Sequence, residues 1–125
     1  MPILLHTADW HLGAPQYPQI YRDGALPALL KLAVDHNADA VLCAGDVFDR
    51  PNPDQRVKDD LLKFLLQTGA DRHIKFIFFV GNHDYTTKAK DYHSLIYLRM
   101  LQKRLTNVVV LDTTQGKAKN ICGFN

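Results

Sequence analysis

The sequence predicts an α/β fold in which helices flank a largely parallel β-sheet. Short apolar runs of strand length alternate along the chain with longer segments that repeat apolar residues at helical spacing. This order of strand, helix and strand favours right-handed crossovers between parallel strands. With 125 residues, 46% of them apolar, the chain can form one compact core, so we expect a single domain or a part of one.

The strands are predicted from runs of mainly aliphatic and aromatic residues. The first three are Ile3 to Leu5, Ala40 to Cys43 and Ile74 to Val80. A fourth is expected at Val108 to Leu111 and a fifth around Asn120 to Phe124. Runs this apolar are typical of strands that are buried in the interior.

Helices are predicted between these strands. Residues 23–36 form a broad apolar face, and Pro27 is compatible with a helix because it falls near the start. Residues 54–68 repeat apolar side chains at helical spacing, and Gly69 is a natural stop. A third helix is expected from Asp91 to Leu105.

Composition excludes several classes of protein. No apolar run reaches the roughly 18 residues of a membrane span, and the N-terminus lacks the features of a signal peptide. Cys43 and Cys122 form no Cys-x-x-Cys pair, which argues against a disulfide framework or a thiolate zinc site. We therefore expect a cytoplasmic protein without a membrane partner.

Charge is distributed unevenly along the chain. Residues 1–62 contain five Lys and Arg against nine Asp, whereas residues 63–125 contain ten against four. A metal is expected in the acidic half. The surplus of positive charge in the basic half would suit binding to a phosphate backbone, although scattered Lys and Arg residues more often belong to a solvated surface.

A polar cluster follows each of the first three predicted strands. The clusters are Asp9-Trp10-His11, Gly45-Asp46-Val47-Phe48-Asp49 and Gly81-Asn82-His83-Asp84. Asp46 follows Asp9 by 37 residues and Asn82 follows Asp46 by 36, which is about one strand–helix unit each time. The carboxyl ends of parallel strands meet at one sheet edge, so these clusters are expected to converge there.

Convergence of these side chains favours a divalent metal. Taken alone, each cluster is more often an ordinary turn or helix cap. Together, two carboxylates, an imidazole and an amide without cationic neighbours need a compensating charge. Such ligands suit Mn²⁺, Fe²⁺ or Zn²⁺ and do not select among them.

The patterns Asp-x-His, Gly-Asp-x-x-Asp and Gly-Asn-His-Asp, in this order, resemble the calcineurin-like metallophosphoesterases. The strings at residues 6–13, 44–49 and 80–84 are most similar to SbcD-type DNA-repair nucleases, and the resemblance extends from Ile3 to about Leu111. It implies that the chain forms the N-terminal half of an αββα sandwich.

The resemblance implies a role for each motif residue. Asp9 and His11 would bind a first metal ion, Asp46 would bridge two ions, and Asn82 would bind the second. Mn²⁺ is the expected ion, with Fe²⁺, Zn²⁺ or Mg²⁺ as alternatives. His83 would be the catalytic residue, stabilising the transition state or protonating the leaving oxygen.

Three further residues belong to these strings. Asp49 and Asp84 are expected beside the ligands, with Asp49 orienting His83; for each, a solvated turn carboxylate is an equal alternative. His6, at the end of the first strand, is expected to be a core histidine.

The family pattern continues with a metal-binding histidine and a Gly-His-x-His segment, which this sequence lacks. His93 is the sole histidine after His83, and it falls within the third predicted helix. Residues 1–125 are therefore expected to be a partial nuclease domain without the C-terminal metal-binding histidine motifs. Such a piece is expected to have an incomplete site and to expose an apolar face of its sheet.

The third predicted helix has more apolar residues than one core-facing stripe requires. In the family a helix at this position takes part in homodimerisation, which the resemblance implies here. The candidate interface residues are Tyr92, Leu95, Ile96, Leu98, Met100 and Leu101. Packing on the sheet, with Tyr97 or Met100 exposed, is the alternative.

The expected function is metal-dependent hydrolysis of DNA phosphodiesters by an exonuclease and endonuclease of SbcD type, weak or absent in this chain alone. The resemblance implies DNA and an SbcC-type ATPase as partners. A phosphatase or small-molecule phosphodiesterase of the same family is one alternative. An inactive dimerisation or binding module is another.

Overall fold

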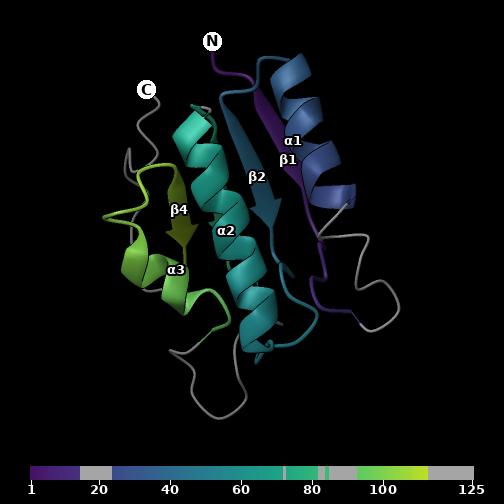
Figure 1. The fold of residues 1–125 in the computed structure, drawn as a ribbon, viewed down its shortest axis with the longest axis vertical. Helices are drawn as coiled ribbons and strands as arrows, with labels where there is room; N and C mark the ends of the chain where they lie inside the picture. The colour runs from purple at the N-terminus through teal and green to yellow at the C-terminus, as the bar shows by residue number, and fades with distance from the viewer. Residues whose placement is uncertain (15–23, 72, 82–83, 85–92, 113–125) are drawn as a thin grey trace.

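The structure, a computed structural model, describes all residues except 15–23, 72, 82–83, 85–92 and 113–125 (Figure 1). In chain order the elements are β1 (Leu4–Thr7), α1 (Leu26–Asp35), β2 (Ala40–Ala44), α2 (Gln55–Asp71), β3 (Lys75–Phe79), α3 (Ile96–Leu101) and β4 (Val108–Leu111). The strands form one sheet in the order β1-β2-β3-β4, and each neighbouring pair is parallel. The predicted α/β class with a largely parallel sheet is confirmed.

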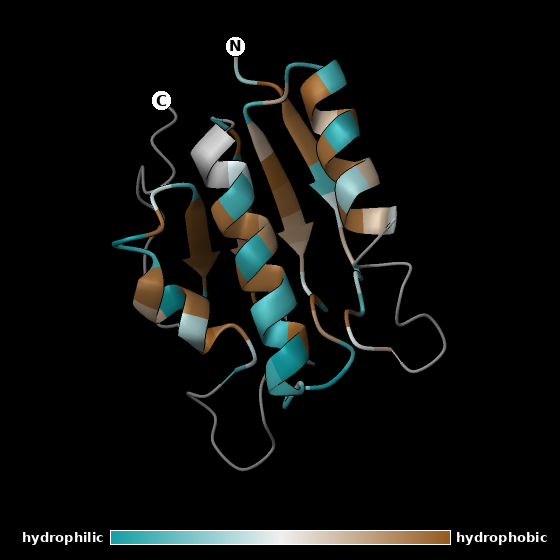
Figure 2. Ribbon diagram, in the orientation of Figure 1, coloured by the Kyte–Doolittle hydropathy of each residue, from teal (hydrophilic) through white to brown (hydrophobic). Residues whose placement is uncertain are grey.

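The core lies between the helices and one face of the sheet. Sequential strand order combined with right-handed crossovers places the connecting helices on the same face, and α1 and α2 lie across it in Figure 1. β2 and β4 are almost continuously apolar, whereas β1 ends in polar residues and α2 alternates between apolar and polar residues (Figure 2). Fully or nearly fully buried side chains between the helices and this face include Ala33, Val41, Cys43, Leu61, Leu65, Phe76, Phe78, Leu98, Val108 and Val110.

The opposite face of the sheet is partly exposed. The strand register places Leu42, Ile77, Phe79, Val109 and Leu111 on this face; Ile77 is buried, whereas Phe79 is 41% exposed. None of the described helices covers it. An apolar face left open in this way is unusual for a parallel sheet, which is normally covered on both sides.

His6 lies on this open face, so the expectation of a core histidine is wrong. It is paired in register with Leu42 and its side chain is exposed. The alternation of β1 directs Leu5 and Thr7 toward the helices and His6 away from them.

All three helices differ from their predicted ranges, and α1 ends one residue early, at Asp35. The expected stop at Gly69 is wrong, because α2 continues to Asp71. The apolar face of α2 is buried, and this burial outweighs the roughly 1 kcal/mol that glycine costs within a helix. The strand expected around residues 120–124 lies outside the described residues.

The third helix is shorter than the predicted 91–105, since α3 begins at Ile96 and ends at Leu101. Residues 91 and 92 lie outside the described residues. Just before α3, the ring of His93 accepts the backbone N–H of Leu95 at 3.2 Å, and Ser94 donates its N–H to a carbonyl of the preceding loop. Because these hydrogen bonds are not helical ones, the helix begins only after them, at Ile96.

Within the part of the chain that the structure describes, no helix is long and apolar enough to cross a membrane.

Candidate metal centre

Three of the predicted ligands gather at the carboxyl edge of the sheet. Asp9, His11 and Asp46 each offer one ligand atom, and these atoms lie within 4.8 Å of one another. Asp9 and His11 follow β1, and Asp46 follows β2. The separation suits one small cation held by two carboxylates and an imidazole.

Backbone hydrogen bonds hold the two ligand loops side by side. Asp9 donates its N–H to the carbonyl oxygen of Gly45 at 3.2 Å, and His11 donates to that of Asp46 at 3.0 Å. The pairing continues with a parallel bridge between Leu12 and Phe48. The loops thus extend the β1–β2 pairing beyond the strands and fix the relative positions of the ligands.

Within these loops, exposed ligands alternate with buried apolar residues. Asp9 is exposed and the side chain of His11 is 43% exposed, whereas Trp10 and Leu12 are buried. Asp46 is half-buried, and two buried side chains, Val47 and Phe48, follow it. Burial of the apolar residues anchors each loop and leaves the ligands facing outward.

Trp10 is fixed by a specific set of contacts. Its ring meets that of Phe78 edge to face, with centroids 5.6 Å apart. Its Nε1–H donates to the hydroxyl of Thr7 at 2.9 Å, and that hydroxyl donates to the carbonyl of Leu42 at 2.7 Å. Thr7, which sequence reasoning missed, therefore links β1, β2 and the ligand loop.

The ligand backbones adopt a conformation that L-residues rarely use. The φ angles are 56° at Asp9, 49° at His11 and 52° at Asp46, and Gly45 has a φ of 93°. Such residues typically cost about 1–3 kcal/mol each and cluster at functional sites, where the surrounding structure holds them. Three of them on neighbouring ligands support a binding role for this edge.

Asp84 ties the loop after β3 to the loop after β2. Its side chain is buried, and its Oδ2 accepts the N–H of Gly81 at 2.7 Å and the N–H of Asp46 at 3.2 Å. Burial raises the pKa of this carboxyl, while the two hydrogen bonds partly oppose the rise. Gly45 and Gly81 approach closely here, so that a Cβ on Gly45 would lie 3.6 Å from the Cα of Gly81.

The site has a negative character that a cation would offset. The pKa of Cys43 is raised to about 12, chiefly by burial and in part by the charges of Asp84, Asp9 and Asp46. Carboxylates that disfavour a nearby anion favour a cation. The donor set and its surroundings therefore fit a divalent metal.

Asp49 lies beside His11. Its Oδ1 is 3.5 Å from Nδ1 of His11, a contact that helps to orient the imidazole. Asn82 and His83 lie outside the described residues, as does any contact between Asp49 and His83.

The candidate dimer helix is divided between core and surface. Leu95 and Leu98 are fully buried, whereas Met100 is 78% exposed. Ile96 and Leu101 are half-buried, and Tyr92 lies outside the described residues. The exposed Met100 matches the alternative in which the helix packs on the sheet. Its side chain forms a small apolar surface on α3.

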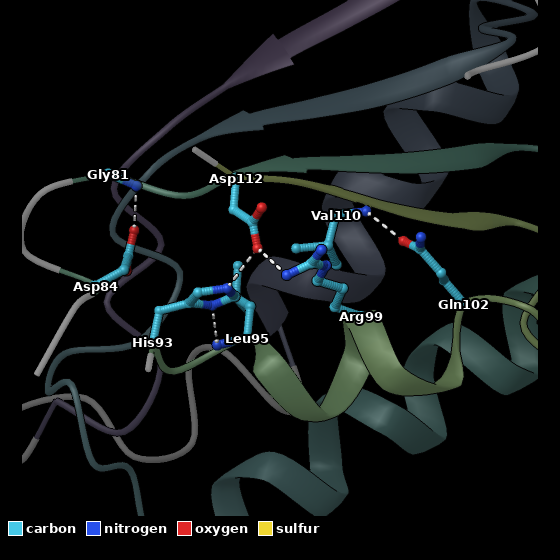
Figure 3. A network of polar contacts seen from close by, with 8 residues as sticks. All are labelled: Gly81, Asp84, His93, Leu95, Arg99, Gln102, Val110 and Asp112. Carbon is cyan, nitrogen blue, oxygen red and sulfur yellow. Dashed lines mark hydrogen bonds and ion pairs between the residues drawn. The ribbon is translucent and has the colours of Figure 1, made fainter. Parts of the chain in front are cut away.

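Sequence reasoning also missed Asp112, which directly follows β4 at the same sheet edge. Its carboxylate contacts His93 and Arg99 (Figure 3). The available signal was position, because Asp9, Asp46 and Asp112 each follow a parallel strand within two residues.

Comparisons with known proteins agree with this geometry. The chain is 29% identical over 120 residues to the DNA double-strand break repair protein Mre11 of Sulfolobus acidocaldarius, covering 93% of this chain and 30% of the relative. It is 37% identical over 87 residues to SbcD, one of the subunits of the nuclease SbcCD of Escherichia coli K12, covering 65% of this chain and 21% of the relative. It is 33% identical over 121 residues to Mre11 of Archaeoglobus fulgidus, covering 93% of this chain and 26% of the relative.

The chain thus spans less than a third of the length of these relatives. Residues 3–121 match the family described as calcineurin-like phosphoesterase. This match covers nearly the whole chain, and it includes the loops that carry Asp9, His11 and Asp46. The chain belongs to the calcineurin-like phosphoesterase family.

Proposed function

We propose that this chain carries part of the active site of a metal-dependent DNA nuclease, with exonuclease and endonuclease activity of the SbcD and Mre11 type. The observation that supports it best is the gathering of Asp9, His11 and Asp46 within 4.8 Å on strained backbones. The names of the relatives, which include a nuclease and DNA double-strand break repair proteins, point to DNA as the substrate.

In this proposal Asp9 and His11 would hold one cation together with Asp46, and Asp46 would also be a ligand of a second cation. Asn82 holds the second through its amide oxygen. When bound, the cations supply positive charge that activates a water for attack on phosphorus and offsets the developing negative charge. His83 protonates the leaving oxygen, a role that typically contributes on the order of 10²–10⁴ in rate.

The second cation has only Asp46 and Asn82 as ligands in this sequence. Water, or histidines from outside residues 1–125, would have to complete its coordination. The activity of this chain alone is accordingly proposed to be weak or absent. Mn²⁺ is the proposed ion, because it accepts both carboxylate and imidazole ligands.

The names of the relatives also support a proposal about partners. We propose that the complete protein acts on DNA together with an SbcC-type ATPase, and that it forms a homodimer through α3. With Leu95 and Leu98 in the core, Met100 and the half-buried Ile96 and Leu101 remain for such an interface. Sedimentation of Met100→Lys tests it; an unchanged monomer–dimer equilibrium would remove α3 from the interface. The cytoplasmic location stays a prediction.

Metal binding is tested by thermal unfolding with and without Mn²⁺. At one hundred times the dissociation constant, the ion should stabilise the wild-type chain by about 2.7 kcal/mol. Asp46→Asn should abolish the gain; it preserves shape, and asparagine tolerates the positive φ of this position. The matched control is Asp35→Asn, because Asp35 is an exposed carboxylate at the C-terminal end of α1.

Substrate class is tested by comparing linear DNA with p-nitrophenyl phosphoesters in the presence of Mn²⁺. The proposal expects at most weak cleavage by this chain, directed at DNA, and any such cleavage should be lost in Asp46→Asn and retained in Asp35→Asn. Hydrolysis confined to the small esters would assign the chain to a phosphatase or small-molecule phosphodiesterase. Absence of any Mn²⁺-dependent stabilisation would leave only an inactive binding module.

A further inference from the structure

A buried cluster of charged and polar side chains lies beside the candidate metal centre. Oδ2 of Asp112 is 2.9 Å from Nε2 of His93 and 2.9 Å from Nη1 of Arg99 (Figure 3). The side chains of Asp112 and His93 are 0% and 1% exposed, and that of Arg99 is 31% exposed. The cluster joins the end of β4 to α3 and to the segment that precedes α3.

Hydrogen bonding defines the state of His93. Leu95 donates its backbone N–H to Nδ1 at 3.2 Å, so the ring proton resides on Nε2 and is donated to Asp112. With Nδ1 accepting and Nε2 donating, both ring nitrogens are engaged within the protein. His93 is thereby excluded as a metal ligand, and its ring orientation is fixed by Asp112.

From this cluster a continuous set of bonds leads to a metal ligand. Ser94, next to His93, donates its N–H to the carbonyl of Asp84 at 3.0 Å. The side chain of Asp84 in turn accepts the N–H of Asp46 at 3.2 Å. Asp112 is therefore connected to Asp46 through described residues alone.

Stability alone does not explain a fully buried carboxylate. Removing such a charge from water costs several kcal/mol, and well-packed apolar residues often serve stability equally well or better. Asp112 lies at the same sheet edge as Asp9 and Asp46, a location that is typical of a residue supporting the metal ligands. Second-layer partners that orient metal ligands commonly change metal affinity tenfold or more when they are lost.

We propose that Asp112 is a positioning residue for the metal centre: paired with Arg99, it fixes His93 and Ser94, and through Asp84 it holds Asp46 in its binding conformation. The inference rests on the proposed function, because it requires Asp46 to bind a cation. It assigns a role to residues that lie outside the three sequence motifs.

The test measures Mn²⁺ affinity by titration calorimetry on the whole chain, at a temperature where every variant is folded. Asp112→Asn preserves the shape of the side chain and removes its charge, and it should weaken Mn²⁺ binding about tenfold. Val110→Ala is the control, because Val110 is a buried residue of the same strand whose apolar side chain forms none of the hydrogen bonds or ion pairs of the cluster, and its truncation should lower stability. It should leave affinity unchanged.

A second pair of variants covers the case in which Asp112→Asn does not fold. Arg99→Met removes the cation from a partly exposed position and should weaken Mn²⁺ binding, whereas Arg99→Lys should restore most of it. A merely structural role would make affinity follow stability across all the variants.

Three outcomes separate the two ideas. Weaker binding in Asp112→Asn and Arg99→Met, with Val110→Ala and Arg99→Lys near wild type, supports the inference. Wild-type affinity in Asp112→Asn, or in Arg99→Met where Asp112→Asn does not fold, overturns it and leaves the proposed function intact. A wild-type chain that binds no Mn²⁺ overturns both.

Discussion

One carboxylate oxygen of Asp84 accepts the backbone N–H of Asp46, 38 residues away in sequence. The same oxygen accepts the N–H of Gly81. A side chain from the third motif therefore fixes the backbone of the second motif, and the two loops form one structural unit.

Replacement of Asp84 should expose the importance of this contact. Asp84→Ala leaves two donors without their acceptor in a buried setting, at about 1–3 kcal/mol each. Asp84→Asn retains one side-chain carbonyl and should destabilise the chain less. Urea unfolding measures both; equal stability of Asp84→Ala and wild type would show that water replaces the carboxylate without cost.

Gly45 should tolerate substitution poorly because of its backbone. At a φ of 93°, Gly45→Ala should lower the free energy of unfolding by about 1–2 kcal/mol. The matched control is Gly24→Ala, where no atom lies within 4 Å of the added Cβ and φ is not positive. That change should be neutral or stabilising by up to about 1 kcal/mol. Similar losses in both variants would contradict the prediction.

Trp10 should report metal binding directly. It is the single tryptophan of the chain and stands between Asp9 and His11 in sequence. Paramagnetic Mn²⁺ should quench its fluorescence saturably, whereas Mg²⁺ should compete without quenching. Asp46→Asn should abolish the saturable component. Equal quenching in wild type and Asp46→Asn would indicate collisions with free ions instead of binding.

The buried thiol of Cys43 should be inert. With its pKa raised to about 12, the thiolate fraction at pH 8 is roughly 10⁻⁴. In a Cys122→Ser background, Ellman's reagent should react with Cys43 only after denaturation. The same shift should make stability fall as the pH rises from about 9, where the unfolded thiol ionises, to about 12. Rapid labelling of the native chain at pH 8 would refute the assignment.

The open face of the sheet should promote self-association. Phe79 is 41% exposed on this face, whereas its neighbour Phe78 is buried against the helices. Phe79→Thr should reduce association in sedimentation velocity with little loss of stability. Phe78→Thr, the matched change on the other face, should cost about 3–5 kcal/mol. Undiminished association of Phe79→Thr would place the contact elsewhere.

The sequence was informative about the features that depend on chain order. Strand spacing brought Asp9, His11 and Asp46 to one edge, because parallel strands joined by single helices leave little freedom in where their ends meet. The start of α3 and the exposure of His6 were not predictable in this way. The first depends on side-chain hydrogen bonds of His93, which periodicity does not contain, and the second on which sheet face the helices cover.

The role of Asp112 was likewise not predictable from the sequence. A lone aspartate after a strand has no pattern of its own, and His93 lies within a segment that reads as helix. Only their distance of 2.9 Å in the folded chain reveals the cluster.

The alternation of Asp9, Trp10, His11 and Leu12 means that one short string is subject to two kinds of selection. Natural selection for a stable fold preserves Trp10 and Leu12, whether or not the protein hydrolyses anything. Only selection for binding preserves Asp9 and His11. Among homologues, loss of Asp9 and His11 beside an intact Trp10 and Leu12 would identify lineages that keep the fold without metal binding.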